Sequence, residues 1–219
     1  MLNNNDGDDP MHVQALLEKR RSVRHFDPDY ALNEETLSTL VALASKSPNG
    51  NNIQATRYLV IDDPELRNTL LPIAFNQQQV LEASALILML GDYEAFAKNN
   101  ITSILEEGFQ AGFYEESTRD FLADAAIQYY ASKTEQELAI ELTRDVSLAA
   151  MSFVLLAQEA GLQTITMSGY HSAELKSALN ISDRYLDVML IAVGKGIKEG
   201  HQTVRHPVER IMYHNHIPA

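Results

Sequence analysis

The stretch Thr134–Ala160, 27 residues without glycine or proline, constrains the fold more than any other part of the sequence. It predicts one long α-helix, because glycine and proline are the residues that most oppose a helix interior. Its first half mixes charged with apolar residues, but from Val146 onward almost every side is apolar. Such a helix must be covered on all sides, either centrally or at a subunit interface. Gly161 is the expected residue just past its end.

The rest of the chain alternates predicted helices and strands, which indicates an α/β or α+β protein with a central sheet. Strands are expected at Arg57–Ile61, Ala85–Leu90, Gln163–Met167 and Val188–Val193, with Gly91-Asp92 stopping the second. Helices are expected at Met11–Arg20, from the N-cap Asn33 to about Lys46, from Asp63-Pro64 onward and near Ala173–Leu179, with an irregular helical pattern over Tyr93–Lys133.

The first ten residues are expected to form a disordered tail, and residues 11–219 a single domain. With a formal net charge of −13, nonspecific attraction to nucleic acid or to an anionic membrane is not expected. The chain has no cysteine, which excludes disulfides, thiolate metal sites and a cysteine nucleophile. The N-terminus is acidic and polar, so no signal peptide is expected there. The longest nearly apolar run, Val146–Ala157, is too short to span a membrane. A cytoplasmic protein is expected.

A basic cluster follows the first predicted helix. Four of the 17 basic residues fall between Lys19 and Arg24, in an otherwise acidic protein. Arginine forks and the hydroxyl of Ser22 suit the oxygens of a phosphate. The alternative is a set of solvated cations that interact favourably with the negative end of the helix dipole.

Four further segments carry polar groups near element boundaries. Amide side chains can read a ring edge that both donates and accepts hydrogen bonds, and a glycine at a strand end allows close approach of a ligand. Each segment also has an ordinary alternative: a turn, a solvated helix end, a strand-end turn or a surface arginine. The segments are Ser47–Gln54, Phe75–Gln79, Met167–Tyr170 and Val204–Pro207.

In this order and spacing, the five segments together resemble the nitroreductase family. The family pattern begins with Arg-x-Ser-x-Lys/Arg and continues with a Pro/Asn/Gln loop, an Asn-bearing segment before an apolar strand, a Gly-Leu-x-Thr stretch and a late Arg-x-Pro. Here these are Arg20–Arg24, Ser47–Gln54, Asn76–Leu90, Gly161–Tyr170 and Arg205–Pro207, while Tyr185–Lys195 resembles the last core strand. The resemblance extends from about Met11 to the C-terminus, so chance convergence of weak motifs is a poor explanation.

The resemblance implies an α+β fold in which helices flank a central, mostly antiparallel sheet. It implies a homodimer with the long helix at its interface and a C-terminal segment exchanged between protomers. It also implies FMN as cofactor and NAD(P)H as co-substrate. Hydride would pass through flavin N5 to a flat acceptor such as a nitroaromatic or a quinone, in a ping-pong sequence that needs no catalytic side chain.

The resemblance also assigns roles to single residues. Arg20, Ser22 and Arg205 would bind the FMN phosphate, with Arg21 beside them. Arg24 would lie by the N1/O2 edge, where reduction builds negative charge. The other implied cofactor-binding residues are Asn76 and Gln79 on the pyrimidine side, Ser168 and Gly169 near N5 with Met167 preceding them, and Pro48, Asn49, Gly50, Asn52 and Gln54 on a loop that reaches the partner's flavin.

Three departures from the family pattern leave the flavin potential and the acceptor open. Ala55-Thr56 replaces a frequent Pro-Trp, Gln79 stands where a lysine is common, and Ser168 where an acidic residue is common. The alternatives are a reductive dehalogenase or enone reductase on the same scaffold, a flavin-binding redox protein without turnover, and a helical interaction protein without cofactor.

Three remaining features have more than one interpretation. Phe109, Phe113 and Tyr114 either line the acceptor pocket or pack between helices. Gly194–Gly200 resembles a dinucleotide fingerprint, but too little chain follows it for a βαβ unit, so we interpret it as a turn. The pair His214 and His216 lacks nearby carboxylates, and no metal site is expected.

Overall fold

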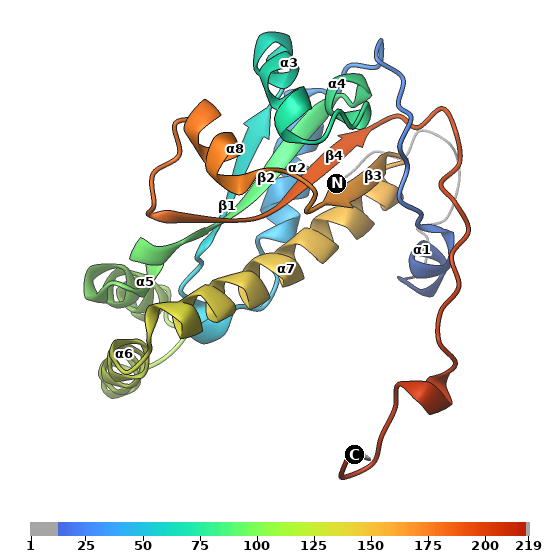
Figure 1. The fold of residues 1–219 in the computed structure, drawn as a ribbon. Coiled ribbons are helices and arrows are strands. Elements are labelled where there is room, and N and C mark those ends of the chain that lie inside the picture. Colours follow the sequence, from blue (N-terminus) through green and yellow to red (C-terminus); the bar gives the residue numbers. More distant parts are fainter. Residues whose placement is uncertain (1–12, 218–219) are drawn as a thin grey trace.

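A computed structural model describes residues 13–217 (Figure 1). Its centre is a four-stranded sheet in the order β1-β2-β4-β3, in which every neighbouring pair is antiparallel. The strands are β1 (Thr56–Ile61), β2 (Ala85–Asp92), β3 (Gln163–Met167) and β4 (Tyr185–Gly194). The expected antiparallel α+β architecture is confirmed, and the predicted tail 1–10 lies outside the described residues.

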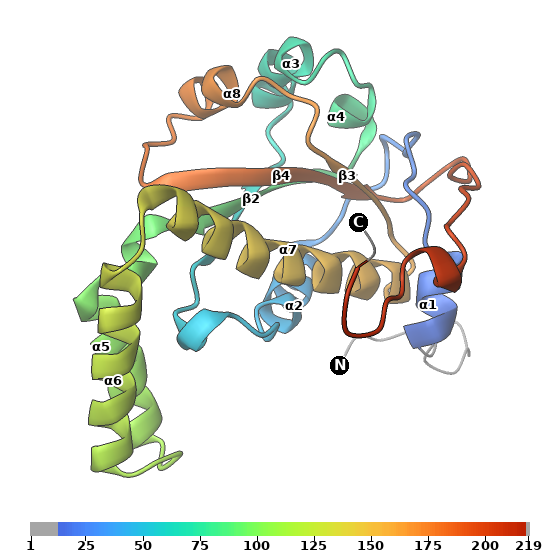
Figure 2. The ribbon, with the colours of Figure 1, turned by 60° about the horizontal axis from the view of Figure 1, so that its bottom comes forward.

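Helices cover both faces of this sheet (Figure 2). On one face lie α3, α4 and α8, and on the other lie α2 and α7. The helices are α1 (Val13–Lys19), α2 (Glu34–Ala44), α3 (Pro64–Ile73), α4 (Gln79–Glu82), α5 (Lys98–Gln110), α6 (Glu116–Ala131), α7 (Glu135–Glu159) and α8 (Ser172–Ala178), with short 3-10 turns at Gly50–Asn52, Tyr93–Phe96 and Val208–Arg210.

Strand β2 is buried along its whole length because its two faces serve two different cores. Side chains alternate across a strand. Leu86 and Leu88 therefore pack with α3 and α8, whereas Ile87 and Met89 pack with α2 and α7. This explains why its sequence is uniformly apolar rather than alternating.

Helix α7 confirms the predicted long helix, with Thr134 forming a capping box with Glu137 at its start. Gly161 lies just past its end with φ +74°, in the left-handed region that glycine adopts freely. The expectation of cover on all sides is not met within one chain. Val146 and Phe153 are fully buried, but Leu148 and Met151 are 44% and 39% exposed. Within this chain the sheet covers only one side of the helix.

Gly91-Asp92 does not stop β2, contrary to the sequence prediction. Gly91 pairs with Thr56 inside the sheet, where a Cβ atom would lie 2.7 Å from the Cβ of Leu142 on α7. Asp92 is fully buried, and its carboxylate accepts hydrogen bonds of 2.8 Å from Nε and Nη2 of Arg184. Arg57 adds an ion pair at 2.9 Å. Partners distant in sequence therefore allow a charged residue to end a buried strand.

The irregular pattern predicted over Tyr93–Lys133 is two antiparallel helices, α5 and α6, which form an arm beyond one end of the sheet (Figure 2). They join at Gly112, whose φ is +76°. Tyr130 and Leu142 belong to a third core, which ties this arm to α7. Within residues 13–217, no helix is long and apolar enough to cross a membrane.

Replacing Asp92 by Asn tests the buried ion pairs. Burial opposes the ionised form, but hydrogen bonds from Arg184 and from the Glu94 N–H, with the charges of both arginines, hold the pKa of Asp92 below its ordinary value. Its stabilising effect is therefore present above that ordinary value and is lost as the pH falls through the folded-state pKa. We expect D92N to lower the unfolding free energy at pH 7 by about 1.5–3 kcal/mol, and by less at acidic pH, in urea titrations.

The matched control is Asp183→Asn, which removes a fully exposed carboxylate paired with Lys176 at 3.0 Å. This variant should unfold like the wild type, since exposed ion pairs contribute little. If D92N lowers the unfolding free energy by the same amount at pH 7 and at acidic pH, the role assigned to the ionised carboxylate is contradicted.

Candidate functional site

The basic segment passes from helix to extended chain beside the first residues of β3. After α1 ends, Ser22 forms a parallel bridge to Thr164, and the Val23 N–H donates to the Thr164 carbonyl at 3.1 Å. Arg20 is partly buried there. The pKa of Arg20 is lowered, mainly by burial and to a lesser extent by repulsion from Arg205 and Arg21. Arginines 185 positions apart in the sequence, Arg20 and Arg205, are thus brought into electrostatic contact.

These cations have no acidic partner in residues 13–217. None of the four arginines of the two segments forms an ion pair with a carboxylate there, although other arginines of the chain do. Arg205 donates to Thr203 Oγ1 and to the Val204 carbonyl, each at 2.8 Å, and Arg24 is exposed. Several unneutralised positive charges held together form a surface that an anion would stabilise.

Arg21 faces a different direction from Arg20 and Ser22. Side chains alternate along extended backbone. Arg21 lines a separate cavity that Arg20 and Ser22 do not line, and it donates to Gln202 Oε1 at 3.0 Å. Its place among the cofactor-binding residues stays a prediction, and the structure puts its guanidinium on the other side of the segment.

At the other end of β3, the amide-bearing segment Phe75–Gln79 contacts the glycine-bearing segment Met167–Tyr170. Gln77 Nε2 donates to the Gly169 carbonyl at 2.9 Å, and the rings of Phe75 and His171 lie edge to face with centroids 4.7 Å apart. Phe75 and Asn76 both have φ +54°, which is strained for a phenylalanine. Within the described residues, the Asn76 side chain makes no hydrogen bond and is exposed, so its amide is available to a ligand.

Gln79 is less available than Asn76. It is 5% exposed, and its Nε2 already donates to Gln77 Oε1 at 3.0 Å and lies 3.2 Å from Met167 Sδ. Met167 is buried as well, whereas Ser168 is exposed at the end of β3. Gln79 and Met167 therefore support the surface that Asn76 and Ser168 present.

The loop Ser47–Gln54 is held by Asp145 of α7. Both carboxylate oxygens accept from the Gly50 N–H at 3.1 Å, and Asn49 Oδ1 accepts from the Gln54 N–H at 3.0 Å. Tyr130 Oη donates to the Gly50 carbonyl at 3.1 Å. Three residues of the loop have positive φ, namely Asn51, Asn52 and Gln54. The loop is a strained turn held in place by a buried carboxylate.

This loop lies far from the arginines of the same chain. Asp145 contacts the loop, whereas Gln158, 13 residues later on α7, lines the cavity next to Arg21. At 1.5 Å per residue, these two helix positions are about 20 Å apart. One chain therefore presents two separate parts of the predicted site.

The aromatic residues proposed for an acceptor pocket lie on the α5–α6 arm. Arg119 stacks over the Phe109 ring at 4.9 Å, and Tyr114 Oη donates to the Leu105 carbonyl at 2.9 Å. Both therefore have roles within the arm. Phe113, in contrast, is 79% exposed at the tip. Packing explains two of the three residues, and Phe113 is left uncovered by residues 13–217.

Sequence reasoning did not single out Asp145 or Gln77. A carboxylate immediately before the apolar half of the long helix was the available signal for Asp145, because a buried charge requires a partner. Gln77 had no such signal, since its partner Gly169 is 92 positions away. His214 and His216 are exposed, and residues 13–217 hold no cluster of the kind that binds a metal.

The nitroreductase family model matches residues 17–195. A protein of Bacillus subtilis (strain 168) named "Putative NAD(P)H nitroreductase YodC" is 32% identical over 196 residues, covering 90% of this chain and 95% of that protein. A protein of Lactiplantibacillus plantarum named "CLA biosynthesis enone reductase" is 28% identical over 190 residues, covering 85% of this chain and 87% of that protein.

A solved structure from Exiguobacterium sibiricum, described as a "putative nitroreductase in complex with FMN", superposes with a TM-score of 0.89 at 29% identity, covering 95% of this chain and 99% of that one. The fold and the cationic cluster define the class as an α+β protein whose sheet edge carries a surface suited to an anion. The family match then identifies the chain, which belongs to the nitroreductase family of oxidoreductases.

Two substitutions of Asp145 separate its charge from its hydrogen bond. Burial raises the pKa of Asp145. The ionised carboxylate therefore lowers the stability of the folded protein above the folded-state pKa. This loss of stability disappears below the ordinary pKa of an aspartate. Asp145→Asn keeps an acceptor for Gly50 and removes the charge. We expect it to be at least as stable as the wild type at pH 7. Asp145→Leu leaves the Gly50 N–H unpaired and should lose about 1–3 kcal/mol in urea unfolding.

The two variants control for each other, because both remove the charge and only one removes the acceptor. Equal unfolding midpoints for Asp145→Asn and Asp145→Leu would show that the contact with Gly50 does not hold the loop.

Proposed function

We propose that this protein is an FMN-dependent oxidoreductase that passes hydride from NADH or NADPH to a flat acceptor such as a nitroaromatic or a quinone, in a ping-pong sequence. The observation that carries the proposal is the gathering of Arg20 and Arg205, which repel each other and have no carboxylate partner in residues 13–217. Such crowding is unfavourable unless an anion neutralises it. The relative solved with FMN supplies a candidate of the right charge.

The arrangement fits the two ends of FMN, a phosphate and a ring edge with carbonyl and N–H groups. The arginine cluster lies beside Thr164, and the amide-bearing surface lies beside Met167. Thr164 and Met167 are three positions apart on β3, or about 10 Å. The arginines therefore suit the phosphate end of FMN, and the amide-bearing surface at that separation suits its polar ring end.

Each residue then has a distinct task. Arg20, Ser22 and Arg205 bind the phosphate, and Arg24 provides positive charge at the N1/O2 edge. Asn76 hydrogen-bonds the pyrimidine side, and the backbone of Ser168 and Gly169 borders N5. When bound, FMN supplies the hydride chemistry, while the chain supplies placement and electrostatics. Pro48, Asn49, Gly50, Asn52 and Gln54 reach the flavin held by a partner subunit.

A homodimer explains the surfaces that one chain leaves uncovered. Leu148 and Met151 on α7 and Leu17 on α1 expose apolar side chains. The C-terminal segment runs away from the sheet (Figure 1) and exposes several more: Val204, Val208, Ile211, Met212, Tyr213 and Ile217. Apolar surface on this scale marks an interface. We infer a second copy as its occupant, with exchange of the C-terminal segments, because the site residues of one chain lie in two separate places.

Enone reduction is the second candidate, since one relative carries that name. An enone, like a quinone, offers a flat conjugated acceptor for hydride. The replacement of the family's frequent acidic residue by Ser168 makes the pocket less negative and leaves both acceptor types open. Parallel turnover with a nitroaromatic, a quinone and an enone would rank the candidates.

The proposal predicts that purified protein takes up FMN and oxidises NADH or NADPH steadily when a quinone or nitroaromatic is present. Arg20→Gln removes a charged donor to the phosphate, a loss of about 1.5–3 kcal/mol. We therefore expect its dissociation constant for FMN, measured by fluorescence quenching, to rise about 10- to 100-fold.

Arg119→Gln is the control for this experiment, because Arg119 lies on α6 and pairs with Glu106 at 2.9 Å. It should bind FMN like the wild type. Protein that binds no FMN contradicts the proposal altogether, whereas FMN binding without oxidation of either nicotinamide would indicate a redox binder rather than an enzyme.

Leu148→Asp tests the dimer. A carboxylate in the centre of an apolar interface is costly to desolvate, so we expect this variant to sediment as a monomer where the wild type sediments as a dimer. Leu66→Asp is a matched control, since Leu66 on α3 is similarly exposed, at 39%, on the opposite face of the sheet. A Leu148→Asp protein that remains dimeric would exclude the outer side of α7 as the interface.

A further inference from the structure

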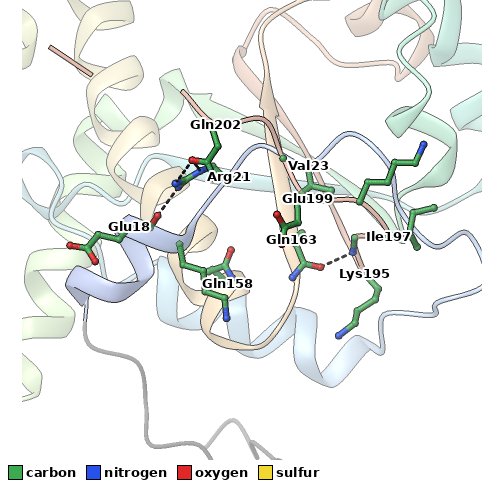
Figure 3. Close-up of a pocket in the computed structure, with 13 residues that line it drawn as sticks. Glu18, Arg21, Val23, Gln158, Gln163, Lys195, Ile197, Glu199 and Gln202 are labelled. Atoms are coloured by element: carbon green, nitrogen blue, oxygen red, sulfur yellow. Dashed lines mark hydrogen bonds between the residues drawn. The ribbon is translucent and has the colours of Figure 1, made fainter. Parts of the chain in front are cut away.

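Figure 3 shows a polar cavity beside the basic segment, and Arg21 but not Arg20 lines it. Its volume is about 510 Å³, and it lies between the end of α1, the start of β3 and the loop that follows β4. The residues proposed to bind the FMN phosphate do not line it. Its walls include Glu18, Lys19, Arg21, Gln158, Gln163, Lys195, Lys198, Glu199 and Gln202.

The charge of this cavity is positive although the chain as a whole is acidic. Three lysines line it, Lys19, Lys195 and Lys198, and none forms an ion pair or a side-chain hydrogen bond within residues 13–217. With Arg21 they outnumber the two carboxylates on the same wall, Glu18 and Glu199. Ammonium groups without partners, facing a common space, attract an anion.

An amide on the cavity wall adds a hydrogen-bond donor to the charges. Gln158, near the end of α7, is only 9% exposed, yet its side chain makes no hydrogen bond to any described residue. Figure 3 places it between Arg21 and Gln163 on the cavity wall. Its amide atoms are open to the cavity, so they can bind a ligand there. An anion in the cavity would accept a hydrogen bond from it.

The walls are also held in place before any ligand arrives. Gln163 Oε1 accepts from the Gly196 N–H at 2.6 Å, and Arg21 holds Gln202. A Cβ atom at Gly200 would lie 2.6 Å from the Ser22 carbonyl oxygen, so only glycine lets this loop pack against the basic segment. Preorganised walls lower the entropic cost of binding.

We propose that this cavity binds the phosphate group of a small phosphorylated ligand, separately from the site proposed for FMN. Lys195 and Lys198 neutralise the phosphate, Lys19 adds charge, and the Gln158 amide donates to it. The phosphate belongs either to NADPH, whose 2′-phosphate NADH lacks, or to a phosphorylated metabolite that is not a substrate.

Inorganic pyrophosphate is the probe, titrated by calorimetry into protein saturated with FMN, so that the Arg20 cluster is occupied. We expect one binding event per chain. The double substitution Lys195→Gln and Lys198→Gln should weaken it about tenfold or more, since each lysine contributes a charge-assisted contact. Gln158→Met, which keeps the volume, should weaken it about tenfold.

The control is the double substitution Lys46→Gln and Lys98→Gln, which removes the same charge from exposed lysines outside the cavity. It should bind pyrophosphate like the wild type. Absence of pyrophosphate binding by the wild type, or equal loss in both double variants, overturns the proposal. FMN uptake is read separately from its absorbance; if the protein takes up none, the same four proteins are compared without flavin.

Steady-state kinetics distinguish the two possible sources of the phosphate. If NADPH is the source, the Lys195/Lys198 variant raises KM for NADPH about tenfold and leaves KM for NADH unchanged. If both KM values are unchanged while pyrophosphate binding is lost, a separate phosphorylated metabolite is the source. Both results support the cavity as a phosphate site.

Discussion

Helix α7 imposes the constraint on which the rest of the structure depends. Its inner side must be covered, and the sheet does this through residues such as Val146 and Phe153. Close packing of Leu142 is possible only because residue 91 is glycine. The same helix holds the loop Ser47–Gln54 through Asp145 and lines the cationic cavity through Gln158. Fixing one helix therefore fixes the spacing between two separate polar regions. Residues 13–217 leave an apolar side of the helix, with Leu148 and Met151, exposed.

Local sequence patterns were sufficient to predict most of the helices and strands. The long helix, its glycine stop and the four strands follow from periodicity and from glycine and proline placement, which act within a few residues. The extension of β2 through Gly91 and Asp92 could not be predicted in this way. It depends on Arg184, 92 positions later, because without that partner a buried aspartate would end the strand. The division of α5 from α6 likewise required knowing that Gly112 adopts positive φ.

The site was predictable as a set of segments but not as an arrangement. Arginine and amide runs indicated the chemistry, and the structure brings Arg20 close to Arg205 and Gln77 into contact with Gly169. Which side each residue faces depends on the bridge between Ser22 and Thr164, which no local pattern reveals. The glycine spacing of Gly194–Gly200, interpreted as a turn, is explained by close approach: its last glycine packs against the backbone of the basic segment.

The bridge also explains why five consecutive residues can serve two anion surfaces. Alternation sends Arg20 and Ser22 to one side and Arg21 to the other, so that one extended segment separates two positive regions. Burial and Arg205 are the main causes of the lowered pKa of Arg20, and Arg21, on the cavity side, adds to them. An anion on either side reduces the repulsion between Arg20 and Arg21. For two charges about 10 Å apart in a solvent-like dielectric, such coupling is on the order of 0.4 kcal/mol. Occupancy of the cavity would therefore strengthen phosphate binding at Arg20 modestly, and the effect would weaken with added salt because the distance is close to the Debye length.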